Sequence, residues 1–543
     1  MNEMNSMFNN EDKTGLNSCG KIPPSIFNDV LGPVMRGPSS SHTAASYRIG
    51  DVVRKSLGGT PSRVVFDFDI NGSLAATHEG QGSDMGLVCG LCGKPLTEEG
   101  AENYEVLAAD QGLECVYNIC DYGAVHPNNF KIIATRGEMT RRWQAISTGG
   151  GMFEMYELDG FAVSVKGDFF ELLAKFADDA DCAKANALAD VSPRPEFRTV
   201  SANGATSLLS LKYSSSEAAE SAKAAASRTD ADIIFIEPIL PTLSRAGCAV
   251  PFVTASGALE YAAANGLSAW ELAAEYEAAR GGISREEVLS AADALVSVME
   301  RSLDEGLAGT EYEDRILGRQ SHLIAEAAAS GKIIPGDVMN NIITSVAAIM
   351  EAKSAMHVIV AAPTAGSCGC LPGALIGASR TLGKPRGELV RAMLAAGLVG
   401  VFIAESATFA AEVAGCEVEC GAGGGMAAAG LACLMGGTPY ECFSAASMSL
   451  QNVTGLACDM AADRVEVPCL GKNIMCALGA AASANMALSG FDCVIPLDET
   501  IAALYDAGRA LPAELRCTFG GLGKCPTSRK IHERLKANKT AGK

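Results

Sequence analysis

Aromatic side chains and histidines are scarce in this sequence of 543 residues. Only 6% of the residues are aromatic although 48% are hydrophobic, so the interior must be built mainly from Ala, Val, Leu, Ile, Met and Gly. That composition is typical of closely packed helices. Because there are only six histidines, few side chains can act as a general base near neutral pH.

Basic residues are too few to balance the acidic ones. The 43 Lys and Arg stand against 63 Asp and Glu, which gives a formal net charge of −20. A surface of that sign excludes nucleic acid and anionic membranes as expected partners. Two uncharged runs, residues 357–379 and 420–440, reach the roughly 20 residues of a membrane span. Both are rich in glycine and the first contains two prolines, so we expect buried helices and glycine turns instead.

An apolar leader is also missing. The first 24 residues are polar and include Glu3, Glu11 and Asp12, so the sequence predicts no signal peptide and a cytoplasmic location. In that location the 19 cysteines are expected to be reduced. They are then metal ligands or small buried side chains, and not a disulfide framework.

The length favours two or three domains, since single cores rarely grow beyond about 300 residues. In the first half, apolar and charged residues alternate through residues 63–70, which predicts a strand with one solvated face. Residues 130–135 and 162–165 are further strand candidates, and residues 170–190 have a helical pattern. A strand–helix–strand unit is expected at residues 208–213, 215–228 and 233–236.

From about residue 255 the composition shifts to Ala, Leu and Glu with helical periodicity. Helix-start signals occur at Ser268 and at Ser284, the latter with Glu287 three residues later. Strand signals are nearly absent there, apart from Val465–Pro468. The expected fold is therefore multidomain, with an N-terminal α/β domain followed by a mostly α-helical domain.

A run of hydroxyl groups, GPSSSHT at residues 37–43, precedes a predicted helix. Hydroxyls and N–H groups at a helix N-terminus favour an anion. The alternative is a serine cap with a solvent-facing histidine, but three serines together with His42 and Thr43 favour a functional site. A second histidine in a motif-like setting is His126 in AVHPNNF, for which a structural role is equally open.

Two glycine clusters could cradle a phosphate or let helices touch. They are STGGG at residues 147–151 and GAGGGM at residues 421–426. Neither matches a nucleotide-binding fingerprint, so both interpretations remain open at this point.

Three cysteines in the last third have an unusual spacing. Cys416, Cys458 and Cys469 are separated by 42 and 11 residues. Three thiolates can hold three corners of a cubic iron–sulfur cluster and leave the fourth iron open to substrate. An open iron is a Lewis acid. From the spacing alone, these residues could also be buried thiols that act as small apolar side chains.

Several motifs, taken in order, resemble those of the iron–sulfur-dependent L-serine dehydratases, in the form that fuses the β and α parts into one chain. The matching pieces are IFNDVLGPVMRGPSSSHTAASYRIG, DINGSLAATHEGQGSD, HPNN, STGGG, VAAPTAGSCGCLPG, GCEVECGAGGGMAAAGLACLMGGTP and GLACDMAADRVEVPC. They extend from about residue 25 to residue 525, which is nearly the whole chain. GPSSSHT and the CD…VPC unit are the most specific of them.

The resemblance implies an α/β domain similar to the allosteric substrate-binding domain of phosphoglycerate dehydrogenases, followed by a helical catalytic domain. A homodimer is the family expectation. The expected divisions are a polar tail at 1–24, a β-type domain at 25–190, a strand–helix–strand unit with linker at 198–250, a helical catalytic domain at 251–525 and a basic tail at 526–543.

The resemblance also implies a chemistry, the β-elimination of L-serine to pyruvate and ammonia. Cys416, Cys458 and Cys469 would hold a [4Fe–4S] cluster, whose open iron would act on the hydroxyl leaving group. His126, or alternatively His42, would remove the α-proton. Substrate contacts are expected from Ser40, Ser41, Thr43, Asp84 and Ser147. Because these motifs lie in the first domain and the cysteines in the second, we expect the active site at the domain interface.

The sequence departs from the family pattern in two places. The acidic motif GQGSD at residues 80–84 has Gln81 where relatives have a histidine. Some relatives end in a cysteine that caps the open iron, whereas here only Cys525, or less favourably Cys517, could take that position.

Other functions stay open at this stage. The same cluster could serve an L-cysteine desulfidase or an L-threonine lyase, which relative turnover would distinguish. A pyridoxal-phosphate ammonia-lyase would use GAGGGM as its phosphate loop, but it needs a Schiff-base lysine, and none lies in a suitable setting near the glycine motifs. A non-catalytic redox sensor would leave the serine-rich motif without a role.

Overall fold

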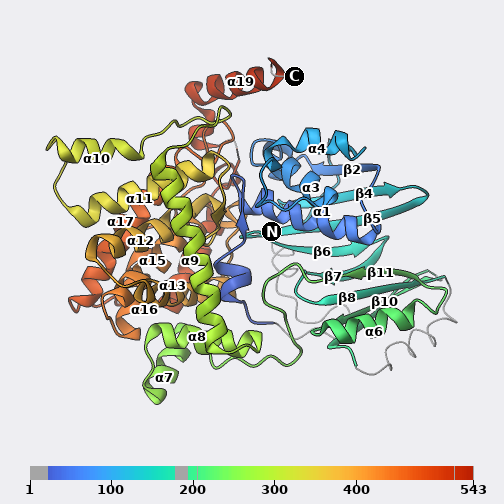
Figure 1. Ribbon diagram of the computed structural model, residues 1–543, viewed down its shortest axis with the longest axis horizontal. Helices are drawn as coiled ribbons and strands as arrows, with labels where there is room; N and C mark the ends of the chain where they lie inside the picture. Colours follow the sequence, from blue (N-terminus) through green and yellow to red (C-terminus); the bar gives the residue numbers. More distant parts are fainter. Residues whose placement is uncertain (1–21, 178–193, 205, 519, 542–543) are drawn as a thin grey trace.

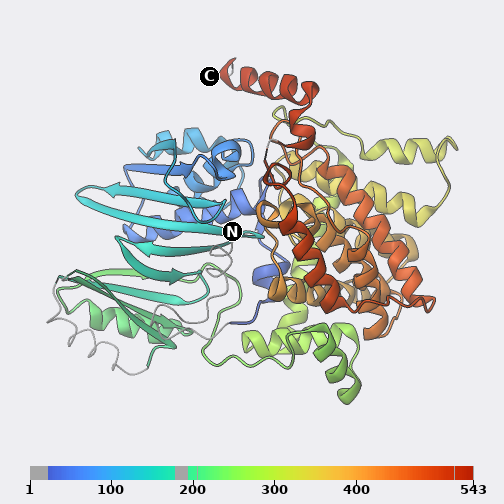
Figure 2. The ribbon, with the colours of Figure 1, turned by 180° about the vertical axis from the view of Figure 1, so that it is seen from behind.

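The computed structural model describes residues 22–177, 194–204, 206–518 and 520–541. Strands gather on one side of the molecule and most of the helices on the other, in both views (Figures 1 and 2). The order of elements confirms the predicted fold class, an α/β part followed by a mostly α-helical part.

The larger sheet has six strands in the order β3-β2-β4-β5-β6-β7. Its β2 and β3 run parallel and all other neighbours run antiparallel. The strands are β2 (Arg63–Asp69), β3 (Glu114–Cys120), β4 (Asn129–Arg136), β5 (Met139–Gly149), β6 (Met152–Leu158) and β7 (Phe161–Val165). The predicted strands of this region are confirmed, although Ile70 lies beyond β2 and is 58% exposed.

Helices α1 (Ala45–Ser56) and α3 (Ser83–Cys92) pack against each other, and α1 also contacts β5 and β6. Their contact is close because Gly90 has no side chain: a Cβ there would lie 2.1 Å from the Tyr47 carbonyl oxygen. The short helices α2 (Leu74–Thr77) and α4 (Tyr104–Asp110) complete this layer.

The smaller sheet has four antiparallel strands in the order β11-β8-β10-β9. They are β8 (Phe170–Phe176), β9 (Phe197–Asn203), β10 (Thr206–Tyr213) and β11 (Asp232–Ile236), and α6 (Ser216–Ala226) covers one face. The predicted strand–helix–strand unit is confirmed, but the helix predicted at 170–190 is wrong over β8. The remainder of that prediction, residues 178–190, lies outside the described residues. Strand β8 is buried on both faces, Leu173 within the core of the larger sheet and Leu172 against α6, so it lacks the polar alternation of a half-exposed strand.

The helical half is organised around α15 (Cys420–Leu434), which packs against four other helices. The GAGGGM cluster lies inside this buried helix, and a Cβ at Gly425 would meet the Leu450 side chain at 2.8 Å. These glycines therefore allow helix contact, and they do not form a phosphate loop. The helices are α7 (Ala255–Asn265), α8 (Ala269–Gly281), α9 (Arg285–Ala308), α10 (Ser321–Ala329), α11 (Asp337–Ser354), α12 (Cys370–Leu382), α13 (Arg386–Ser406), α14 (Ala411–Ala414), α15, α16 (Pro439–Gln451), α17 (Cys469–Leu488), α18 (Leu497–Ala510) and α19 (Pro526–Ala541).

The helix starts predicted at Ser268 and Ser284 are confirmed, and both are capping boxes. The strand predicted at Val465–Pro468 is wrong, because the chain forms turns there before α17. Helix α13 is, within the described residues, the one helix long and apolar enough to cross a membrane. Its apolar window is 78% buried inside the protein, as expected for a core helix.

A segment from the N-terminal end ties the two halves together. The Ser25 hydroxyl and the Ile26 N–H both donate to the buried carboxylate of Glu277 in α8, at 2.5 and 2.7 Å. Farther along, β1 (Val34–Met35) pairs with β12 (Ile359–Val360). The chain therefore enters the helical core before it builds the sheets.

Candidate active site between the two halves

The serine-rich motif lies in the interface between the halves. Ser40–Ala44 form one turn before α1, and Ser39 caps this turn by accepting a hydrogen bond from the His42 N–H. The Ser40 hydroxyl accepts from the N–H of Ala365, which belongs to the helical half. His42 is 0% exposed, so the alternative of a solvent-facing histidine is wrong.

The hydrogen bonds of His42 assign its neutral tautomer. Its Nε2 lies 2.9 Å from the Thr77 hydroxyl, and that hydroxyl donates to the Ser73 carbonyl at 2.7 Å. The shorter of these two contacts is the one to the Ser73 carbonyl, which favours the tautomer in which Nε2 carries the imidazole proton and donates it to Thr77. The lone pair of Nδ1 then points toward the Ser39 hydroxyl at 3.2 Å and the Glu412 carboxylate at 3.5 Å. Burial lowers the pKa of His42, and the charge of Glu412 opposes that effect.

His126 is differently arranged. Its Nδ1 accepts the N–H of Asn128 at 3.1 Å, so the neutral ring carries its proton on Nε2. Burial lowers the pKa of His126 as well, again opposed by the charge of Glu412. The charge of Glu412 therefore acts on both histidines, and its carboxylate lies 3.5 Å from Nδ1 of His42.

The STGGG motif explains how Glu412 reaches this place. Gly149, at the end of β5, forms a parallel bridge with Phe409, just before α14. A Cβ on Gly149 would lie 2.6 Å from the Ala410 backbone nitrogen, and its φ is +100°, so glycine is required for this approach. Glu412 in α14 is thereby fixed against the sheet and is 6% exposed.

Several buried polar atoms at this junction have no hydrogen-bond partner within the described residues. They are Oε2 of Glu412, Oγ of Ser147, and both Oδ1 and Nδ2 of Asn128. Ser147 and Asn128 are neighbours, because the Ser147 N–H donates to the Asn128 carbonyl. Buried polar groups are normally paired, so this cluster indicates a site for a polar ligand.

The cysteines lie on the helical side of the same interface. Cys416, Cys458 and Cys469 are between 3 and 6% exposed, and none is in a disulfide. The side chain of Cys416 is hydrogen-bonded to Cys420 and Cys458, and these bonds hold its pKa well below the usual range. The charge of Lys472 lowers it further. Burial and the charge of Cys416 raise the pKa of Cys469 to about 12.

This donor set fits an iron–sulfur cluster. The three thiols come from separate segments and are free of disulfides, and the low pKa of Cys416 suits a thiolate ligand. Hydrogen bonds to Cys416 and Cys517 raise the pKa of Cys458, so binding of the cluster would have to displace its proton and that of Cys469. Within the described residues, no three His, Cys, Asp or Glu side chains meet as ligands of one ion. A cubic cluster does not require that, since it binds each thiolate at a different corner.

The two C-terminal cysteines are in different environments. Cys525 is exposed, whereas Cys517 is 4% exposed and its side chain is hydrogen-bonded to Cys458. Backbone bonds hold it there, because the Cys517 N–H donates to the Cys458 carbonyl. Gln81, which replaces the family histidine, directs its Nε2 to the Cys517 sulfur at 3.6 Å.

Besides Ser40, two more of the predicted substrate-binding residues are already paired within the protein. Thr43 donates to the Gln81 carbonyl, and Asp84 binds Nδ1 of His78 at 2.7 Å. Although burial opposes it, the hydrogen bond and charge of Asp84 raise the pKa of His78. Ser41 is buried in the same turn, and Ser147 is the predicted residue whose hydroxyl is unpartnered.

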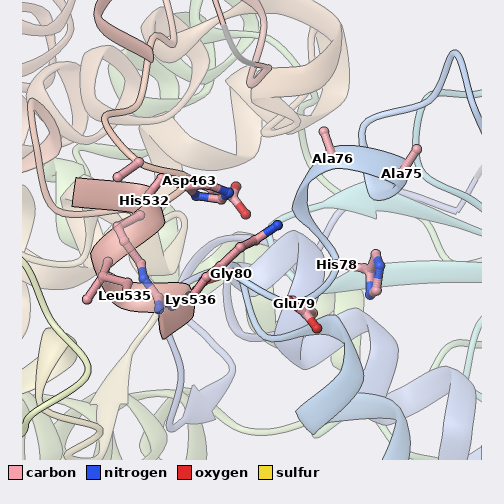
Figure 3. A pocket seen from close by; sticks show the side chains of 11 residues that line it. Ala75, Ala76, His78, Glu79, Gly80, Asp463, His532, Leu535 and Lys536 are labelled. Carbon is pink, nitrogen blue, oxygen red and sulfur yellow. Dashed lines mark hydrogen bonds between the residues drawn. The ribbon is translucent and has the colours of Figure 1, made fainter. Parts of the chain in front are cut away.

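A separate cavity of about 260 Å³ lies beside this site (Figure 3). The end of α2 and the turn after it, residues 75–80, form one side and α19 another, with His532 and Lys536 on the side of α19 (Figure 3). Asp463 lies between them, and burial raises its pKa to about 7. None of the predicted site residues lines the cavity, so it is distinct from the buried junction.

Sequence reasoning missed Glu412, Thr77 and Asn128. Glu412 lies outside the quoted motifs, and its role arises only from packing across the interface. Thr77 belongs to the DINGSLAATHEGQGSD motif, but nothing in that motif indicates a contact with His42. Asn128 could have been found, since it belongs to the HPNN motif.

Two families match the chain in order. The family described as Serine dehydratase beta chain matches residues 31–119, and Serine dehydratase alpha chain matches residues 264–522. The chain is 36% identical to the probable L-serine dehydratase alpha chain of Bacillus subtilis over 253 residues, which cover 46% of this chain and 84% of that protein. It is 34% identical to the L-serine dehydratase alpha chain of Peptoniphilus asaccharolyticus over 268 residues, 49% of this chain and 92% of that protein. L-serine dehydratase 1 of Escherichia coli is 26% identical over 516 residues, 89% of this chain and 95% of that protein.

Proposed function

Because the chain belongs to the serine dehydratase family of lyases, we propose that it converts L-serine to pyruvate and ammonia by β-elimination. The observation that carries the proposal is the buried junction between the two halves. There, two histidines and Glu412 lie beside unpartnered polar atoms and next to the cysteine-bearing loops.

We propose that Cys416, Cys458 and Cys469 hold a [4Fe–4S] cluster. When bound, it supplies a Lewis acid for the poor leaving group, hydroxide. Lys472 supports the thiolates, since its Nζ lies against the Ala457 carbonyl at 2.6 Å and its charge lowers the pKa of Cys416. Of the two C-terminal cysteines, we assign the capping role to Cys517 and not to Cys525, because its thiol contacts Cys458.

The α-proton requires a base, and the hydrogen bonds favour His42 over His126. Thr77 holds the His42 ring by accepting from Nε2, which leaves Nδ1 to take a proton in place of its hydrogen bond from the mobile hydroxyl proton of Ser39. Glu412, 3.5 Å from Nδ1, stabilises the imidazolium that forms. The Nδ1 of His126 is already occupied by the Asn128 N–H. His126 is thus placed to donate a hydrogen bond through Nε2 and remains the second candidate base.

The remaining residues bind and enclose the substrate. Ser147 offers an unpartnered hydroxyl to the substrate carboxylate, and Ser41 lies in the turn that the serine-rich motif forms. Ser40, Thr43 and Asp84 shape the site through their bonds to Ala365, Gln81 and His78. Elimination yields aminoacrylate, which tautomerises and hydrolyses to pyruvate and ammonia without further catalysis. We further propose a cytoplasmic homodimer.

A pyridoxal-phosphate mechanism is not supported. Its phosphate loop would be GAGGGM, which lies within the buried helix α15. Lys353, a fully buried lysine, is engaged with the Val465 carbonyl. L-cysteine and L-threonine remain alternative substrates of the same site.

The test is anaerobic purification followed by iron and sulfide analysis and a pyruvate assay. We expect about four irons per chain for a [4Fe–4S] cluster and turnover of L-serine above that of L-cysteine and L-threonine. A protein without sulfide, or one that releases pyruvate only after addition of pyridoxal phosphate, would contradict the proposal.

A further inference from the structure

Glu412 is a buried carboxylate without a strong cationic partner. Its side chain is 2% exposed, and its one ion-pair contact within the described residues is His42 at 3.5 Å, whose pKa burial lowers. Its second oxygen, Oε2, has no partner in the described part of the chain. A buried carboxylate in this state is costly unless a cation or donor meets it.

The other carboxyl group nearby does not compete for a cation. Burial, together with the charges of Cys416 and Glu412, raises the pKa of Glu419 well above its usual range, which favours the neutral form of that side chain. Glu419 is also hydrogen-bonded to Thr364, whereas Oε2 of Glu412 has no partner within the described residues. No Lys or Arg side chain pairs with Glu412 among those residues. The described part of the chain therefore leaves room at Glu412 for a positively charged group.

The neighbouring unpartnered atoms identify the shape of that ligand. Asn128 Nδ2 and Ser147 Oγ are donors buried at the same junction, and they suit a carboxylate. Glu412 Oε2 is an acceptor, and it suits an ammonium, which carries three donors. Unpartnered donors and an unpartnered acceptor on segments joined by the Gly149–Phe409 bridge match an α-amino acid, whose carboxylate and ammonium share one carbon.

We propose that Glu412 receives the α-ammonium group of the substrate and so selects amino acids over carboxylic acids that lack it. The inference rests on the proposed function and adds a specificity-determining residue to it. It accounts for the glycine at position 149, because only close packing of β5 against residues 409–410 brings Glu412 to the junction.

The experiment compares L-alanine with propanoate, which differ only in the ammonium group and have no leaving group to eliminate. Their affinities for the reconstituted holoenzyme are measured by calorimetry and as inhibition constants in the pyruvate assay. In the unaltered protein we expect L-alanine to bind about 10- to 100-fold more tightly, the range of a charge-assisted hydrogen bond. In Glu412→Gln this preference should fall to near one, with the iron content unchanged.

Two further variants make the result interpretable. Glu412→Asp keeps the charge and should retain part of the preference, which also covers the case in which Glu412→Gln does not fold. Glu388→Gln removes one negative charge at the surface, where Glu388 pairs with Lys384 at 3.3 Å, and should leave the preference unchanged.

The inference is overturned if folded Glu412→Gln still prefers L-alanine, or if the unaltered protein has no preference. Failure of the proposed function looks different. In that case no pyruvate forms from L-serine, yet calorimetry still shows the loss of preference in Glu412→Gln.

Discussion

Replacing His42 is the most direct test of how the site works. His42→Ala removes the Nδ1 nitrogen that lies 3.5 Å from Glu412, and water can take the place of the ring as partner of Ser39 and Thr77. Loss of a general base lowers kcat by roughly 10²–10⁴-fold. His126→Ala is the matched control, because it also removes a partly buried imidazole on which the charge of Glu412 acts. We expect it to lower kcat by less than about tenfold, the worth of one hydrogen bond of ~1.4 kcal/mol.

The pH profile of kcat/KM provides an independent measure. The base must be unprotonated, so activity rises as pH increases through its pKa. Burial lowers the pKa of His42 below its usual value of 6.5, so the ascending limb should lie below pH 6.5. The limb should vanish in His42→Ala and persist in His126→Ala. Anaerobic steady-state kinetics with iron analysis of each variant checks both statements. Near-normal kcat in His42→Ala, with the limb lost in His126→Ala, would reverse the two roles.

Three other outcomes can be checked. Cys458→Ala should lose iron, sulfide and activity together because a cluster ligand is gone, whereas Cys433→Ala should keep all three; full iron in the first would refute the ligand set. Cys517→Ser should lower the apparent KM for L-serine, since it removes a thiol that competes for the open iron of the cluster. The same change at exposed Cys525 should leave this KM unchanged. Iron loss in Cys517→Ser would instead make Cys517 an obligatory ligand. The Cβ of Gly149→Ala would lie 2.6 Å from the Ala410 backbone nitrogen. This variant should lower the free energy of unfolding by about 1–3 kcal/mol, measured by thermal unfolding, and reduce kcat/KM at least tenfold. Unchanged kinetics would mean that residues 409–410 can move away freely.

The sequence was sufficient for the fold class and for the motifs, because these depend on local patterns. Alternation along residues 63–70 and the capping boxes at Ser268 and Ser284 are local signals, and both are confirmed. Strand β8 was mistaken for a helix because its Leu, Ala, Glu and Lys residues favour helices and both of its faces are buried. Only its pairing with β10 and β11 makes it a strand.

The candidate site was predictable in its location but not in its chemistry. The serine-rich motif and HPNN do reach the interface, as their place in separate segments suggested. The preference for one of the two histidines as the base could not be predicted from the sequence. It depends on which nitrogen of His42 contacts Thr77 and which nitrogen of His126 contacts Asn128. The position of Glu412 depends on a β-bridge between Gly149 and Phe409, which are 260 residues apart. No pattern in either segment predicts that bridge.

The N-terminal segment enters the helical core. Its contacts there can hold the two halves together without the peptide chain that joins them. Ser25 and Ile26 are anchored on Glu277 in α8, and β1 pairs with β12 of the helical half. A chain break at the exposed turn of Ala246 and Gly247 would leave all of these contacts intact. The products would be two polypeptides, and the N-terminal segment of the first would pack into the helical core of the second. Fusion therefore guarantees equal amounts and a high effective concentration of the two parts, while recognition between them is already encoded in the first described residues of the chain.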